Sequence, residues 1–216
     1  SMIVFDDADL DRAAQGAIAG MNFTWSGQSC GSNSRLLVQR PIHDALVDRI
    51  AKKLEGHRLG DPLDPESQQG TVIHERHYDS VMAYIDLARE EGGAVVGCGA
   101  RPSDPALGNG LFVPPTVITG LPLDGRVVRE EIFGPVLSVI PFDTEEEALE
   151  IANALDYGLT ASVWTSDIGR ALRVVRDVEA GFTWVNDSSK HFPNVPYGGV
   201  KSSGLGREES MEELLS

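Results

Sequence analysis

Basic residues are scarce in this sequence. Lysine and arginine together number 18, against 33 aspartate and glutamate residues, so the formal net charge at pH 7 is -15. A protein that binds nucleic acid needs a basic surface to meet the phosphate backbone, and so acidic a chain opposes such binding. We therefore expect no nucleic-acid partner and interpret the acidity as a contribution to solubility.

Long apolar runs are missing as well. No segment approaches the roughly 18 to 20 continuous apolar residues that a membrane helix requires, so we expect no membrane partner. The opening residues, Ser1 to Phe5, are too few for a secretion signal and lack its basic leader. These two features favour a cytoplasmic protein.

Cysteine is rare, with only Cys30 and Cys98 in the chain. Two cysteines make no disulfide framework, and neither has the Cys or His spacing of a zinc site, which predicts a metal-free protein in a reducing compartment. Cys98 follows an apolar run and is interpreted as structural. His74 and His77 lie three residues apart on one predicted helix, and without further ligands we interpret both as surface residues.

The length and the pattern of the chain indicate one α/β domain. Its 216 residues, 41% of them hydrophobic, can bury a good core and fit one domain or a large piece of a bigger protein. Strand-like and helix-like patterns alternate, which predicts a mostly parallel open sheet with helices on both faces. The expected strands are 3–5, 36–38, 94–96, 111–113, 136–140, 159–164 and 182–185. The expected helices are 10–21, 41–54, 74–91, 144–155, one that begins after Asp167 and ends near Gly181, and 207–215.

Two of these elements carry more detailed predictions. The pair Pro114-Pro115 is expected to end the strand 111–113, because proline cannot donate to a strand ladder. In the helix that begins after Asp167, three apolar residues are expected to face the core: Ile168, Leu172 and Val175.

The surroundings of Cys30 are unusual for a cysteine of the core. The small residues Ser29, Gly31 and Ser32 adjoin it, where a helix gives way to a strand. Small neighbours would let a substrate carbon approach the sulfur, and free backbone N–H groups in an irregular connection could bind an oxyanion. The pattern favours a reactive thiol, with a buried or incidental cysteine as the alternative.

Three stretches of the sequence resemble one known family. They are Phe23 with Gly27-Gln28, Cys30 and Arg35; Glu130-Glu131-Ile132-Phe133-Gly134-Pro135-Val136; and the segment from Pro196 to Glu208. In this order and at similar intervals, they resemble the NAD(P)-dependent aldehyde dehydrogenase superfamily over essentially the whole chain. The resemblance implies the fold of that family's catalytic domain, NAD or NADP as the cofactor and a small aldehyde as the substrate.

The resemblance also implies a mechanism. Cys30 attacks the aldehyde, hydride passes from the thiohemiacetal to the nicotinamide, and water hydrolyses the thioester to release an acid. The backbone N–H of Cys30 supplies one oxyanion donor. Glu131 matches the residue that hydrogen-bonds the nicotinamide ribose, and Phe133 matches the aromatic residue packed beside that ribose. Taken without the resemblance, these two positions are more typical of a solvated glutamate and a core phenylalanine.

Substrate-pocket residues follow from the same resemblance. The segment 188–197 matches the part of the family that shapes the substrate tunnel, with His191 and Tyr197 where members often carry pocket aromatics. Thr24 falls near the Cys30 side of that pocket. A structural alternative is that Tyr197 and the two glycines after it only set a turn.

The chain departs from the family in length. Members are much longer and place a cofactor-binding domain before the catalytic one, so residues 1–216 are expected to be the catalytic, nucleophile-bearing domain with the cofactor-binding domain absent. No residue here matches the glutamate that serves the family as general base, so we expect this chain to be inactive alone. The full-length protein is expected to form a homodimer or homotetramer.

Two alternatives stay open at this point. One is a CoA-acylating aldehyde dehydrogenase, which passes the thioester to coenzyme A instead of water. The other is a non-catalytic, family-derived binding or oligomerisation module. Retention of Cys30, Glu131 and Phe133 argues against the module, which would need none of them.

Overall fold

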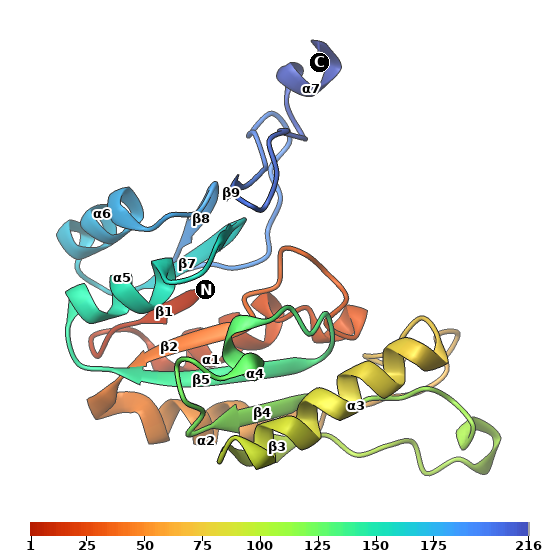
Figure 1. The fold of residues 1–216 in the computed structure, drawn as a ribbon. Helices are drawn as coiled ribbons and strands as arrows, with labels where there is room; N and C mark the ends of the chain where they lie inside the picture. Colours follow the sequence, from red (N-terminus) through yellow and green to blue (C-terminus); the bar gives the residue numbers. More distant parts are fainter. Residues whose placement is uncertain (216) are drawn as a thin grey trace.

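A mostly parallel sheet forms the centre of the molecule (Figure 1). The computed structural model describes residues 1–215, apart from the side chains of Cys98, Glu212 and Leu214, so the interpretation of Cys98 lies outside the described residues. Within them, one sheet has seven strands in the order β3-β4-β5-β2-β1-β7-β8, and β6 pairs with β9 in a second one. The strands are β1 (Met2–Val4), β2 (Arg35–Gln39), β3 (Ala94–Cys98), β4 (Thr116–Thr119), β5 (Val136–Phe142), β6 (Tyr157–Gly158), β7 (Thr160–Trp164), β8 (Phe182–Val185) and β9 (Val200–Lys201).

Helices cover both faces of the main sheet, as predicted. They are α1 (Leu10–Gly20), α2 (His43–Leu54), α3 (Glu75–Glu90), α4 (Arg126–Arg129), α5 (Glu145–Asn153), α6 (Ile168–Asp177) and α7 (Met211–Leu215). Met2 and Val4 of β1 face a core shared with α1 and α2, whereas Ile3 faces the opposite core, shared with α3 to α6. Double-sided burial explains why the central strands are continuous apolar runs instead of alternating ones. None of the described helices is both long enough and apolar enough to span a membrane.

The helix α1 packs unusually close to the sheet. Its N-cap residue Asp9 accepts hydrogen bonds from the backbone N–H groups of Asp11 and Arg12, which fixes where the helix begins. At Gly16, an added Cβ would lie 2.2 Å from the ring of Trp164 on β7, so glycine is needed for this approach. The helix therefore delivers the chain to the Cys30 connection from a fixed position.

The strand prediction 111–113 was wrong. Phe112 and Val113 are buried but form no strand, and β4 begins only after Pro114-Pro115. The two prolines have no N–H to donate, so the ladder starts at Thr116, whose N–H donates to the Pro135 carbonyl at 2.8 Å. β4 then pairs antiparallel with β3, the exception in the main sheet.

The predicted inner face of α6 was also wrong in part. Ile168 and Leu172 are 70% and 63% exposed, whereas Ala171 and Val174 are buried and Val175 is half-buried. The helix therefore turns the smaller Ala171 and Val174 to the sheet and leaves the larger Ile168 and Leu172 in solvent. The last helix also starts later than predicted, at Met211.

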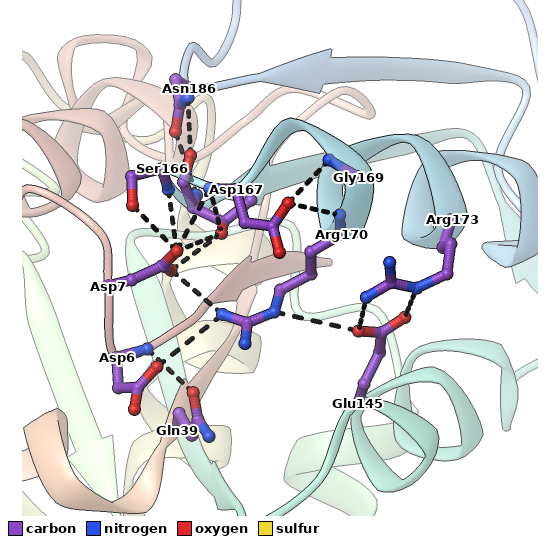
Figure 2. Close-up of polar contacts among 11 residues, drawn as sticks. Asp6, Asp7, Gln39, Glu145, Ser166, Asp167, Gly169, Arg170, Arg173 and Asn186 are labelled. Atoms are coloured by element: carbon purple, nitrogen blue, oxygen red, sulfur yellow. Dashed lines mark hydrogen bonds and ion pairs between the residues drawn. The ribbon is translucent and has the colours of Figure 1, made fainter.

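Asp7 ties the loop between β1 and α1 to the start of α6 (Figure 2). Its carboxylate accepts hydrogen bonds from the hydroxyls of Thr165 and Ser166, from the backbone N–H of Asp167, and from the Arg170 guanidinium at 3.1 Å. Burial by itself raises the pKa of Asp7, but the hydrogen bonds from Thr165 and Ser166 and the charge of Arg170 outweigh it, so the pKa lies below its ordinary value.

We expect Asp7→Asn to lower the free energy of unfolding by about 1 to 3 kcal/mol at neutral pH, because several donors lose a charged acceptor. A depressed folded-state pKa gives a stabilisation that is complete above the unfolded pKa and is lost as the pH falls through the folded pKa. The difference from wild type should therefore shrink below about pH 4 and vanish once the pH is below the folded-state pKa. Urea unfolding of both proteins at several pH values measures this difference in the free energy of unfolding. Asp6→Asn is the control, because Asp6 lies 3.7 Å from Arg170 and is 47% exposed. An Asp7 effect no larger than that of Asp6 would refute this account.

Candidate functional site

Cys30 lies on an exposed connection between α1 and β2. A short 3-10 helix, Phe23–Trp25, precedes it and is flanked by Asn22 and Ser26, both in the left-handed region with φ of 55° and 56°. Asparagine tolerates this conformation, but it is unfavourable for Ser26, and unfavourable backbone of this kind recurs at functional sites. The prediction of an irregular connection is confirmed here, and the thiol is not sealed in the core.

The backbone beside the thiol has free donors. None of the described residues accepts a hydrogen bond from the backbone N–H of Cys30, nor from those of its neighbours Ser29 and Gly31. An exposed thiol next to unused N–H groups has the chemistry to bond a carbonyl carbon while the carbonyl oxygen gains charge.

Buried polar groups fix the loop that carries Cys30 to the rest of the domain. The Asn33 backbone N–H donates to the Gly20 carbonyl at 2.7 Å, and its side-chain amide donates to the Thr160 hydroxyl at 3.2 Å. Thr160 in turn donates to the Gly31 carbonyl at 3.2 Å. The chain next to Cys30 is thus fixed to β7, while the sulfur side stays open.

Glu130 and Glu131, adjacent in sequence, differ in their surroundings. Glu130 accepts bonds from Arg126 and from the Tyr84 hydroxyl, which lower its pKa to about 2, with the Arg126 bond as the larger cause. Glu131 is exposed and has no hydrogen-bond or ion-pair partner among the described residues. The Glu130 carboxylate is therefore held by its neighbours, whereas the Glu131 carboxylate has no partner in the described part of the chain.

Phe133 holds an unfavourable backbone conformation in the same turn. Its φ is 56°, and its side chain is 39% exposed. A left-handed conformation costs a non-glycine residue about 1 to 2 kcal/mol. The His77 imidazole bonds the Phe133 carbonyl at 2.9 Å, and Val81 lies so close to Gly134 that an added Cβ there would be 2.6 Å away.

Two neighbouring strands bring the segments that carry Cys30 and Phe133 to the same place. β2 pairs in parallel with β5, with Arg35 opposite Ser138, so the two segments that precede these strands enter them at the same edge of the sheet. At Gly27, with φ of 67°, an added Cβ would lie 2.2 Å from the Gly134 carbonyl oxygen. The two segments therefore touch through their backbones.

A cavity of about 340 Å³ opens at this amino edge of the strands. Cys30, Glu131 and Phe133 all line it, together with Arg35 and Thr160. The structure thus brings the predicted nucleophile and the predicted cofactor residues to one cavity, while their roles stay predictions.

The three predicted pocket residues lie elsewhere among the described residues. Thr24 is exposed on the short 3-10 helix, and the His191 imidazole contacts the Glu209 carboxylate at 2.5 Å. Tyr197 is 3% exposed and packs on Phe182 and His191, at ring-centroid distances of 5.2 and 4.5 Å. None of the three lines the cavity, so their assignment to a substrate pocket stays a prediction.

Tyr197 nevertheless reaches the back of the Cys30 loop. An added Cβ on Gly31 would lie 2.5 Å from its hydroxyl oxygen. Burial raises the pKa of Tyr197, and the neighbouring Cys30 adds to the effect, so the hydroxyl stays protonated. It can therefore act only as a neutral group beside the thiol.

His77 is the residue of this region that sequence reasoning missed. It was interpreted as a surface residue, yet its ring is half-buried and bonds the Phe133 carbonyl. Fifty-six positions separate the two residues, and no local pattern in the sequence signals the contact.

Fold and cavity together define a class: an α/β domain with an exposed cysteine facing an acidic and aromatic turn. The chain belongs to the aldehyde dehydrogenase family, whose model matches residues 1–216. It is 46% identical to the aldehyde dehydrogenase tropH of Talaromyces stipitatus and 44% identical to a betaine aldehyde dehydrogenase of Mesorhizobium japonicum, over 100% and 99% of its length.

The solved structure of a relative has the same fold as this chain. The betaine aldehyde dehydrogenase of Staphylococcus aureus in complex with NAD+ matches 98% of this chain with a TM-score of 0.93 and 40% identity. The chain covers 43% and 44% of the two relatives named above and 42% of this structure, so it spans less than half of their length.

We expect Gly27→Ala to destabilise the protein by about 1 to 3 kcal/mol more than Gly92→Ala, because only the first adds an overpacking clash. Both glycines have positive φ, 67° and 89°, but an added Cβ at Gly92 meets nothing within 4 Å. Denaturant unfolding of both variants isolates the clash from the cost of the left-handed backbone. Equal destabilisation would argue against the close approach of the two segments.

Iodoacetamide should label Cys30 well ahead of Cys98, because the Cys30 thiol is exposed next to small residues. Peptide mass spectrometry after a short reaction at neutral pH quantifies each adduct, and Cys30→Ser should remove most of the early label. Equal labelling of the two cysteines would count against Cys30 as a nucleophile.

Proposed function

We propose that this chain is the nucleophile-bearing catalytic domain of an NAD(P)-dependent aldehyde dehydrogenase, which oxidises an aldehyde to a carboxylic acid. The observation that carries the proposal is the shared cavity, lined by the exposed Cys30 on one side and by Glu131 and Phe133 on the other. Membership of the family and the NAD+ complex of the Staphylococcus aureus relative support it.

Cys30 performs the covalent step. Its thiolate forms a bond to the aldehyde carbon, and the electron pair of the C=O π bond moves to the oxygen. The unused backbone N–H of Cys30 donates to that oxygen and stabilises the charge. Because a tetrahedral adduct releases hydride more readily than the free aldehyde, this bond prepares the oxidation.

Glu131 and Phe133 form this chain's part of the cofactor site. A free carboxylate suits ribose hydroxyls, which are donors, and the part-exposed Phe133 ring offers an apolar surface beside them. When bound, a nicotinamide cofactor supplies the acceptor for hydride. The two residues would hold the ribose of that cofactor and so restrict its orientation beside Cys30.

Release of the product completes the reaction. Water adds to the carbon of the Cys30 thioester, the C–S bond breaks, and the thiolate is restored with the acid as product. We assign no base for this step among residues 1–216 and place it in a part of the protein outside them.

The test is an assay of the full-length protein with a panel of aldehydes, NAD+ or NADP+, and Cys30→Ser as the comparison. We expect aldehyde-dependent reduction of the cofactor, with at least about a thousandfold loss in Cys30→Ser. Product analysis in the presence of coenzyme A separates an acid from an acyl-CoA. Full activity of Cys30→Ser would overturn the proposal. An acyl-CoA product would show that the thioester is transferred to coenzyme A and not hydrolysed by water.

The same assay distinguishes the two neighbouring glutamates. Glu131→Gln should lower kcat/KM for the cofactor about 10- to 100-fold, since it removes a charged acceptor from the ribose hydroxyls. Glu130→Gln should mainly reduce stability, since Glu130 bonds Arg126 and Tyr84. The opposite order of effects would show that the wrong carboxylate has been assigned.

A further inference from the structure

Residues 70–77, which we call the bracing segment, contact both halves of the site. The Ser26 hydroxyl donates to the Gly70 carbonyl at 3.1 Å, and the backbone N–H of Ile73 donates to the Gln28 side-chain oxygen at 3.0 Å. These two hydrogen bonds tie the Cys30 loop to the bracing segment. At its other end, His77 bonds the Phe133 carbonyl.

The geometry of His77 suits the support of a strained turn. Its Nε2 lies 2.9 Å from the Phe133 carbonyl oxygen, which can only accept, so Nε2 carries the hydrogen. Its ring stands edge-on to the Phe133 ring at a centroid distance of 6.4 Å. The backbone N–H of His77 donates to Nδ1 of His74 at 3.0 Å, which anchors His77 in the first turn of α3.

Val81 completes the support one helical turn further on. It occupies the space that a side chain at position 134 would need, so α3 meets the turn with both a hydrogen bond and a packed surface. The left-handed φ of Phe133 is unfavourable for its residue type, and a conformation of this kind persists only where the surroundings over-determine it.

We infer that His77 is a positioning residue, which holds the Phe133 carbonyl and thereby presents the Phe133 ring and the Glu131 carboxylate to the cavity. The effect on catalysis rests on the proposed function, whereas the effect on the turn does not. His77 acts through Phe133 and touches neither the thiol nor the reacting atoms.

The experiment compares His77→Ala with His77→Gln in the full-length protein. Glutamine keeps an N–H donor at a similar reach, so it should rescue what alanine loses. We expect His77→Ala to raise KM for the cofactor about five- to tenfold with a smaller change in kcat, as the loss of one hydrogen bond allows, and His77→Gln to stay within about twofold of wild type.

Hydrogen exchange gives a readout that needs no activity. The backbone amide of Val136, which donates to the Gly134 carbonyl next to Phe133, should exchange several times faster in His77→Ala than in wild type and at the wild-type rate in His77→Gln. Iodoacetamide labelling of Cys30 should be unchanged in both, because Asn33 and Thr160 hold the cysteine loop independently. Arg76→Ala is the matched control, since Arg76 is an exposed neighbour on the same helix turn.

The outcomes separate the two proposals. Wild-type exchange of the Val136 amide in His77→Ala, or equal acceleration in His77→Gln and Arg76→Ala, would overturn the role of His77. A wild-type protein without aldehyde-dependent cofactor reduction would refute the proposed function, and the exchange comparison would still decide whether His77 supports the turn.

Discussion

The site depends on the parallel pairing of β2 with β5. Both strands are buried on both faces, and a shift of register by one residue would move every side chain to the opposite core, so burial fixes the register. That register brings the segments before the two strands to the same edge of the sheet, one with Cys30 and the other with Phe133. Ligands of parallel sheets commonly bind at the carboxyl edge, whereas this cavity opens at the amino edge.

Two kinds of constraint then shape the cavity. Backbone approach sets the distance between the two segments, since Gly27 leaves room for the Gly134 carbonyl. Polar bonds set orientation: Thr160 holds the Gly31 carbonyl from the β7 side, and His77 holds the Phe133 carbonyl from α3. Among the described residues, neither the Cys30 thiol nor the Glu131 carboxylate has such a bond, which fits the ligand-binding roles proposed for them.

Much of this arrangement could be predicted from the sequence. The alternation of elements predicted the mostly parallel sheet with helices on both faces, and the small residues around Cys30 predicted its exposed connection. The strand order could not be predicted, because periodicity does not tell which strands become neighbours. Phe112 and Val113 were predicted as a strand because buried coil and buried strand share an apolar pattern. Ile168 was predicted to be buried because it is apolar, yet it is exposed.

The backbone contact between Gly27 and Gly134 has a thermodynamic consequence. Two binding events on opposite sides of so tight a contact are coupled if either one displaces its own segment. Linkage then requires reciprocity: if a ligand on the Glu131 side alters the affinity of the Cys30 side for a second ligand, the second ligand alters the affinity for the first by the same factor. A pair of glycines, without any side chain between them, would in this way set the cooperativity of the domain.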